Sequence, residues 1–302
     1  MAAAGSIRIG VGLGVRTRLH GPEFGPVVDE VERLGFDSLW LSERITGEAP
    51  DPIVAMAYAA GRTTTLKFGM SVLVLPGRNP VVLAKELATL AVMSGGRLLP
   101  AFGLGVADGN EHQAFGVQRQ ERARWFDEAL AVMRACWFDD VVDHDGERFH
   151  YEGLKVRPQP TRLDVWLGGI APSELRRVGR LADGWLPSFI TPSDAAAGRA
   201  VIEQVAADHD RSIEDDHYGV LIPYTMDAVP DLLLGQLARR RPDLDDPAAL
   251  VPVGWDALVD AIKRFVDVGT TKFVVLPITE PTSDADAWAA HLADAADAVL
   301  AS

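Results

Sequence analysis

Residues that could do chemistry gather directly after segments that read as β-strands. Ser42, Glu43 and Arg44 follow the strand-like segment 37–41 and place a carboxylate beside a guanidinium. A longer segment, 103–112, follows a later strand, and a glycine in such a segment lets a flat or anionic ligand approach the backbone closely. These patterns indicate a site for a polar ligand, with a surface ion pair and a long polar loop as the alternative interpretations.

The segment 103–112 combines small and polar residues without a known fingerprint. It carries Gly105 and Val106 followed by Asp108, Asn110 and Glu111, which offer several hydrogen-bond donors and acceptors. The spacing lacks the G-x-G-x-x-G pattern and the helix onset of a dinucleotide-binding turn. As a bare glycine pattern it is therefore a weak indication of a ligand site.

A third candidate lies after the segment 164–167. Gly168, Gly169 and Ile170 precede a predicted helix that starts at Ser173. The first N–H groups of a helix are unpaired, and the helix dipole favours an anion there, so a phosphate-bearing ligand is the expected occupant. A tight turn between strand and helix is the alternative. Ser188, after the segment 183–187, adds a hydroxyl group.

Several other chemistries lack their sequence signatures. The histidines show no H-x-x-x-H or His/Cys pairing, so no metal site is expected. There is no G-x-S-x-G turn and no phosphate-binding P-loop. A barrel aldolase or isomerase is disfavoured because no lysine or carboxylate pair stands convincingly at a strand end. Cys136 lies in a helical pattern, which favours a buried, inert thiol.

Composition limits the classes of partner. The chain has 302 residues, 48% of them hydrophobic, and a formal net charge of −14 at pH 7. An acidic surface repels phosphate backbones and anionic lipid, so neither nucleic acid nor a membrane surface is an expected partner. No window reaches the roughly 20 apolar residues of a membrane span, and no targeting signal stands out. With one cysteine and no disulfide framework, a cytoplasmic protein is expected.

The stretch from Gly69 to Leu104 holds one strand–helix–strand unit. The segment 67–75 is almost continuously apolar, as in a strand buried on both faces of a parallel sheet. A helix is predicted over 81–93, because its apolar residues recur at helical spacing, and Gly95 and Gly96 end it. The next strand is predicted over 98–104.

The same alternation runs along the whole chain. Strands are predicted over 7–13, 37–41, 67–75, 98–104, 164–167, 183–187, 217–223 and 272–276. Helices are predicted over 24–34, 52–61, 81–93, 119–137, 173–181, 195–208, 228–240, 255–268 and 285–300. This α/β order favours a single (β/α)8 TIM barrel over residues 1–302, with an open doubly wound sheet as the alternative. The segment 141–160 reads as a β-hairpin insertion between strands four and five, because Asp145-Gly146 separates two alternating stretches.

These motifs together resemble the bacterial luciferase-like monooxygenase superfamily, and most closely its branch of oxidoreductases that use the deazaflavin coenzyme F420. The resemblance rests on DSLWLSER, SVLVLPGRNPVVLAKELATL, SGGRL before a GLG strand, VWLGG and LADGW, in that order. It covers most of the chain. It implies a hydride-transferring oxidoreductase that acts on a small organic substrate and forms a homodimer.

The resemblance also assigns roles to residues. It implies a cis peptide bond between Ser71 and Val72 behind the deazaflavin ring. Ser42, Ser71 and Val72 are all expected to bind the cofactor. The positions of Gly105, Val106 and Asn110 match residues that line the ring. Gly168, Gly169, Ile170 and Ser188 match the family's phosphate cradle, in agreement with the anion site expected from the glycines and the helix start alone.

One departure from the family pattern concerns proton transfer. Many F420-dependent members carry Asp-His after strand two, where this chain has Glu43 and Arg44. Arginine keeps its proton, so Arg44 is expected to stabilise negative charge on the reduced deazaflavin. Asp108 resembles an acidic position that some family members use as a general acid and is the first candidate for that role, with Glu43 the second. Either carboxyl would suit that role if burial raised its pKa.

Two alternatives stay open at this stage. One is a two-component monooxygenase of the same fold that uses FMNH2 and oxygen, with a separate reductase supplying the reduced cofactor. The other is a non-catalytic deazaflavin- or flavin-binding protein.

Overall fold

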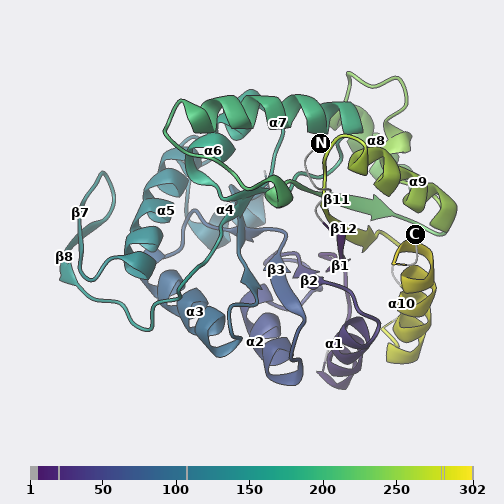
Figure 1. The fold of residues 1–302 in the computed structure, drawn as a ribbon, viewed down its shortest axis with the longest axis horizontal. Coiled ribbons are helices and arrows are strands. Elements are labelled where there is room, and N and C mark those ends of the chain that lie inside the picture. The colour runs from purple at the N-terminus through teal and green to yellow at the C-terminus, as the bar shows by residue number, and fades with distance from the viewer. Residues whose placement is uncertain (1–5, 20, 107, 280, 282, 301–302) are drawn as a thin grey trace.

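Strands and helices alternate along the chain in the computed structural model, which describes residues 6–19, 21–106, 108–279, 281 and 283–300 (Figure 1). The strands are β1 (Arg8–Leu13), β2 (Ser38–Leu41), β3 (Lys67–Met70), β4 (Leu73–Val74), β5 (Leu98–Leu99), β6 (Ala101–Gly103), β7 (Val142–Asp145), β8 (His150–Leu154), β9 (Trp166–Leu167), β10 (Gly184–Trp185), β11 (Gly219–Tyr224) and β12 (Lys272–Pro277). The helices are α1 (Phe24–Arg33), α2 (Pro52–Arg62), α3 (Pro80–Met93), α4 (Gly109–Phe115), α5 (Arg122–Phe138), α6 (Pro172–Leu181), α7 (Pro192–Ala207), α8 (Asp231–Arg240), α9 (Trp255–Val266) and α10 (Ala285–Val299). Short 3-10 turns cover Gly21–Glu23, Asp215–His217 and Pro247–Leu250.

The strands that precede helices pair in parallel. They form two hydrogen-bonded ladders, in the orders β11-β12-β1-β2-β3-β5 and β10-β9-β6-β4. Isolated parallel bridges, Trp185 to Tyr218 and Ser188 to Leu221, connect the β10 side to β11. The α/β fold with parallel strands is confirmed, whereas the ladders do not form one continuous ring, so closure into a barrel stays a prediction.

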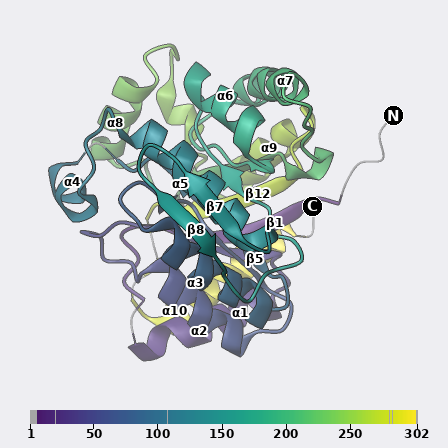
Figure 2. The same ribbon diagram turned by 90° about the vertical axis from the view of Figure 1, so that its left-hand side faces the viewer.

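Helices cover the outer side of the strands. Helices α1, α2, α3 and α10 lie on one side of the strands, and α6, α7 and α9 lie on the other (Figure 2). Neighbouring helices along this layer contact one another, as α1 does α10 and α6 does α7. No helix in the described ranges is both long and apolar enough to span a bilayer.

Local sequence sets where several of these helices begin. Proline occupies the first turn of α2, α3, α6 and α7, where its missing N–H costs no helical hydrogen bond. The Asp51 carboxylate caps α2 by accepting the N–H of Val54, and the Asn79 side chain caps α3. These caps explain why the helix starts could be predicted to within a few residues.

Two predicted strands are broken in the structure. The segment 67–75 divides at Ser71 and Val72 into β3 and β4, and the segment 98–104 divides at Pro100 into β5 and β6. Strand β3 pairs with β2 and β5, whereas β4 pairs with β6. Each break therefore moves the chain from the first ladder to the second, and Pro100 suits such a position because it has no N–H to donate.

Helix α4 was not predicted, because its residues were interpreted as a ligand-binding loop. The Asp108 carboxylate starts the helix by accepting the N–H groups of Asn110 and Glu111, and Gly116 ends it in the left-handed conformation. Farther along, β7 and β8 pair antiparallel inside the segment 141–160. The interpretation of this hairpin as an insertion in a barrel stays a prediction.

An aromatic cluster fills the space between the two ladders. Trp40 of β2 and Trp166 of β9 meet edge to face, with ring centroids 6.5 Å apart. They pack with Ala101, Leu186, Leu221 and Val274, which come from other strands or their ends. A Cβ atom at Gly69 would lie 2.3 Å from the Trp40 ring, so β3 needs glycine there. Since Leu186 and Leu221 also line the cavity described below, this cluster forms part of its floor.

Candidate functional site

A cavity of about 490 Å³ opens at the carboxyl ends of the strands. Most of the predicted ligand-binding residues line it: Ser42, Glu43, Ser71, Val72, Gly105, Val106, Gly168, Gly169 and Ser188. Arg44, Asp108, Asn110 and Ile170 are not among its lining residues. The structure thus brings together residues from loops that lie far apart in sequence, and their roles toward a ligand stay predictions.

Ser71 and Val72 form one wall of the cavity. Their peptide bond is cis, which confirms the bond that the resemblance implies. The N–H of Ser71 donates to the carbonyl of Leu41 at 2.8 Å, which ties this wall to the end of β2. The Ser42 hydroxyl lies 3.5 Å from both the carbonyl and the hydroxyl oxygens of Ser71.

Glu43 lines the same region and is held by the protein. Its side chain is 2% exposed, accepts the N–H of Val74 at 2.7 Å and pairs with the Arg78 guanidinium. Burial raises the pKa of Glu43, against the opposing effects of Arg78 and the Val74 N–H. Arg78, which the sequence analysis did not single out, also donates to the Val74 carbonyl at 2.9 Å. Glu43 and Arg78 together fix the short strand β4.

Asp108 does not have the raised pKa expected of a general acid. It accepts the N–H groups of Glu111 and Asn110, and these hydrogen bonds lower its pKa. Its other carboxylate oxygen lies 3.6 Å from the Arg44 guanidinium. The Glu111 side chain, 3% exposed, approaches the same guanidinium at 4.0 Å and accepts from the N–H and hydroxyl of Thr46. Of the two candidate carboxyl groups, Glu43 is the one with a raised pKa.

A buried arginine holds the glycine loop that follows β6. Arg122, 5% exposed, donates to the carbonyls of Leu104 and Val106 at 3.1 and 3.0 Å. Gly105 between them has a φ of +80°, a conformation that glycine adopts readily. The loop is therefore fixed before any ligand arrives. Arg122 lies in the helical pattern of α5, and the sequence offered no signal for this contact.

The predicted anion site already contains a carboxylate of the protein. The N–H groups of Ile170 and Ala171 both donate to Oε2 of Glu174 at 3.0 Å. A Cβ atom at Gly169 would lie 2.4 Å from the same oxygen, so the carboxylate rests against this glycine. The expectation of unpaired N–H groups here was wrong for these two residues. A glutamate in the first turn of a helix commonly caps it, and that was the available signal.

Two arginines share this part of the cavity. Arg177 and Arg240 both line it together with Gly168, Gly169 and Glu174. The Arg177 side chain pairs through Nε with Asp127 at 2.7 Å. Arg240 lies over the Phe189 ring, 5.2 Å from its centroid. Neither arginine was predicted as a site residue: Arg177 lies on α6, the helix that follows the glycine pair, and Arg240 lies at the end of α8, far away in sequence.

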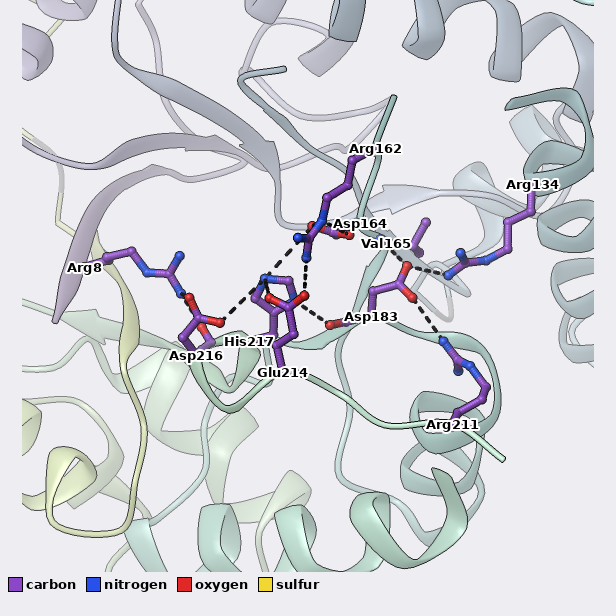
Figure 3. Close-up of polar contacts among 10 residues, drawn as sticks. All are labelled: Arg8, Arg134, Arg162, Asp164, Val165, Asp183, Arg211, Glu214, Asp216 and His217. Atoms are coloured by element: carbon purple, nitrogen blue, oxygen red, sulfur yellow. Dashed lines mark hydrogen bonds and ion pairs between the residues drawn. The ribbon is translucent and has the colours of Figure 1, made fainter. Parts of the chain in front are cut away.

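A second polar cluster lies at the opposite ends of the strands (Figure 3). The side-chain oxygen or nitrogen atoms of Glu214, Asp216 and His217 that could bind a metal ion lie within 4.8 Å of one another. The sequence did not indicate this grouping, because it contains no pair of histidines at metal-binding spacing. Glu214 pairs with Arg162 at 2.8 Å, and Asp216 pairs with Arg8 at 3.0 Å. With arginine partners already in place, the cluster is a network of ion pairs that joins strand starts.

The Asp183 carboxylate extends this network (Figure 3). It pairs with Arg134 at 2.6 Å and with Arg211 at 3.0 Å, and it accepts the N–H of Val165 at 2.9 Å. Its backbone carbonyl accepts from Nδ1 of His217 at 2.7 Å. These contacts fix the starts of neighbouring strands on the face away from the cavity.

Comparison with known proteins identifies the family. A model of the luciferase-like monooxygenase family matches residues 7–242. The chain belongs to this family. The matched range contains the cavity-lining residues named above, from Ser42 to Arg240.

Individual relatives in this family are distant in sequence. The chain is 26% identical over 255 residues to a phthiodiolone/phenolphthiodiolone dimycocerosates ketoreductase of Mycobacterium kansasii. The aligned region covers 74% of this chain and 66% of that protein. The chain is 27% identical over 299 residues to an F420-dependent glucose-6-phosphate dehydrogenase of Mycobacterium avium (strain 104), covering 87% and 86%. The chain thus spans slightly less than two thirds of the ketoreductase.

A solved structure shows the same fold. An F420-dependent secondary alcohol dehydrogenase, in complex with an F420-acetone adduct, superposes with a TM-score of 0.77 and 20% identity, covering 98% of this chain and 99% of that one.

Proposed function

We propose that this chain is an oxidoreductase that transfers hydride between coenzyme F420, bound in the cavity, and a small organic substrate. The cavity carries the proposal: Ser71, Val72 and three glycines of two loops line it at the strand ends. Relatives whose names state F420 dependence support the choice of coenzyme. We further propose one domain over residues 1–302, with the two ladders closing into a barrel around this cavity.

The residues present fit such a coenzyme. A volume of about 490 Å³ lies within the usual range of cofactor pockets. Gly168 and Gly169 bring backbone close to the cavity, and Arg177 supplies positive charge beside them, which suits a phosphate. Ser71 and Val72 offer a backbone wall for a planar ring at the other end.

When bound, a deazaflavin supplies two electrons as hydride and reacts poorly with oxygen. The chain's own residues would position the reactants and handle the proton. Ser42 lies at the wall, where its hydroxyl can orient a polar ring atom. Glu43, whose pKa is raised by burial, is the first candidate on this wall for a group that holds a proton. Arg44, paired toward Asp108 and Glu111, keeps positive charge beside the opening.

A panel of ketones, aldehydes and enoyl compounds tests the activity. With reduced F420, at least one compound is expected to restore the visible absorbance of the oxidised coenzyme at a rate that depends on enzyme concentration. Oxygen uptake with FMNH2 and no reaction with F420 would instead select the monooxygenase. Glu43→Gln should lower kcat more than it raises KM and should flatten the pH profile.

A further inference from the structure

Glu174 occupies the place where a phosphate of the coenzyme is expected. Its Oε2 atom accepts both N–H groups that open α6, those of Ile170 and Ala171. The same oxygen lies against Gly169, which has no side chain to keep it away. A negative charge at a helix N-terminus is stabilised by the unpaired N–H groups and the helix dipole. The chain thus places a carboxylate of its own at this anion position.

A phosphate and this carboxylate cannot share the position. Both are anions that need the same two N–H donors, and like charges at contact distance repel each other. Glu174 also lines the cavity itself, so its charge faces any ligand that enters. Binding of a phosphorylated ligand at Gly168 and Gly169 therefore requires the Glu174 side chain to move.

Arg240 is the cation placed to receive the displaced carboxylate. It lines the same cavity and attracts Glu174 electrostatically. Among the described residues, its guanidinium makes no hydrogen bond or ion pair and lies only over the Phe189 ring. Arg177, by contrast, already pairs with Asp127 at 2.7 Å.

We infer that Glu174 is a specificity-determining residue of the coenzyme site: its carboxylate competes with the ligand's phosphate for the α6 N-terminus and transfers to Arg240 when the phosphate binds. This inference rests on the proposed function, because it takes the ligand to be a phosphorylated deazaflavin. It explains how a carboxylate can stand at a phosphate site: the carboxylate weakens binding of that phosphate without blocking it.

The first test compares Glu174→Gln with the native chain. The amide oxygen of Gln can still accept both N–H groups, so α6 keeps its cap while the competing charge is removed. The variant should bind F420 about tenfold more tightly, and it should bind the phosphate-free deazaflavin alcohol within twofold of the native value. Glu203→Gln, on the exposed side of α7, is the matched control and should change neither affinity. Unchanged or weaker F420 binding by Glu174→Gln would overturn the inference.

Arg240→Met tests the receiving cation in both backgrounds. In the native background the substitution should weaken F420 binding about tenfold, because the displaced carboxylate loses its partner. In the Glu174→Gln background the same substitution should cost less than twofold. Equal losses in both backgrounds would show that Arg240 contacts the phosphate directly, and would overturn the transfer to Arg240.

Inorganic phosphate separates this inference from the proposed function. Phosphate should raise the melting temperature of Glu174→Gln more than that of the native chain, whichever coenzyme the enzyme uses. If no variant binds F420 but phosphate still discriminates between the two proteins, the coenzyme assignment fails and the competition stands. If F420 binds both proteins equally, the coenzyme assignment stands and the competition fails.

Discussion

Replacing Arg78 with methionine isolates the contact that holds the cavity wall. Arg78→Met removes the cation that pairs with buried Glu43, and it also removes the 2.9 Å hydrogen bond to the Val74 carbonyl. It leaves a carboxylate whose side chain is 2% exposed, and within the described part of the chain the Val74 N–H is the one hydrogen-bond partner that remains to it. The substitution should therefore destabilise the fold and loosen β4.

The expected loss is about 3 kcal/mol of unfolding free energy at pH 7. Breaking a buried pair by removing one partner costs about 3–5 kcal/mol, and the 23% exposure of the Arg78 side chain places this pair at the low end. Glu43→Met combined with Arg78→Met should recover about half of the loss or more, because it removes the unpaired buried charge as well. Arg124→Met is the control: this side chain is 67% exposed beside Glu147 and should cost under about 0.5 kcal/mol.

The loss should also depend on pH. The folded-state pKa of Glu43 is already raised above its usual value by burial, and removing Arg78 raises it further. A raised folded-state pKa gives stability that is present below the unfolded value of about 4.5 and is lost as pH rises through the folded-state pKa. Arg78→Met should thus lose more stability at pH 7.5 than at pH 5. Urea unfolding followed by circular dichroism at both values measures this; equal losses, or a loss under about 1 kcal/mol, would refute the reasoning.

Three further predictions concern the scaffold. Glu32→Ala should cost about 2 kcal/mol of unfolding free energy at pH 7 and less at pH 3. Burial raises the pKa of Glu32, but the N–H groups of residues 64–66 outweigh it and lower the pKa to about 2, so the stability that Glu32 contributes is lost as pH falls from about 4.5 toward 2. Urea titrations at the two pH values measure the two losses. Cys136 should resist a thiol reagent until urea unfolds the chain, since burial raises the pKa of its thiol to about 11, and rapid labelling of the native chain would contradict this. Gly69→Ala should lower the melting temperature through a clash with Trp40, equivalent to about 1–3 kcal/mol, whereas Gly61→Ala, with open space at its Cβ position, should be neutral or stabilising.

The order of strands and helices could be predicted because each element carries its own periodicity and its own start or stop residues. Pro80 and Asn79, for example, set the start of α3 locally. Periodicity alone did not show the breaks at Ser71 and Pro100, because both lie inside apolar runs that read as single strands. The resemblance did imply an irregular, cis bond at Ser71 and Val72, which the structure has. Only the pairing of β4 and β6 in a second ladder shows why the chain turns there.

The cavity wall could also be predicted in part, because loops that follow parallel strands lie at one edge of a sheet. What a sequence reading could not supply was the partner of each charge. Arg78 and Glu43 lie 35 residues apart, and Arg122 reaches back to Leu104 from the next helix but one. Asp108 was interpreted as a group beside a ligand, although its carboxylate caps α4. Glu174 was not singled out, although its carboxylate caps α6.

The proposed coenzyme is tested by side-by-side binding of F420, FMN and FAD to the purified chain, measured by fluorescence or calorimetry. We expect saturable binding of F420 at one site per chain, at least tenfold tighter than that of FMN or FAD, and weakened by Arg240→Met. Saturable binding of FMN with no binding of F420 would contradict it.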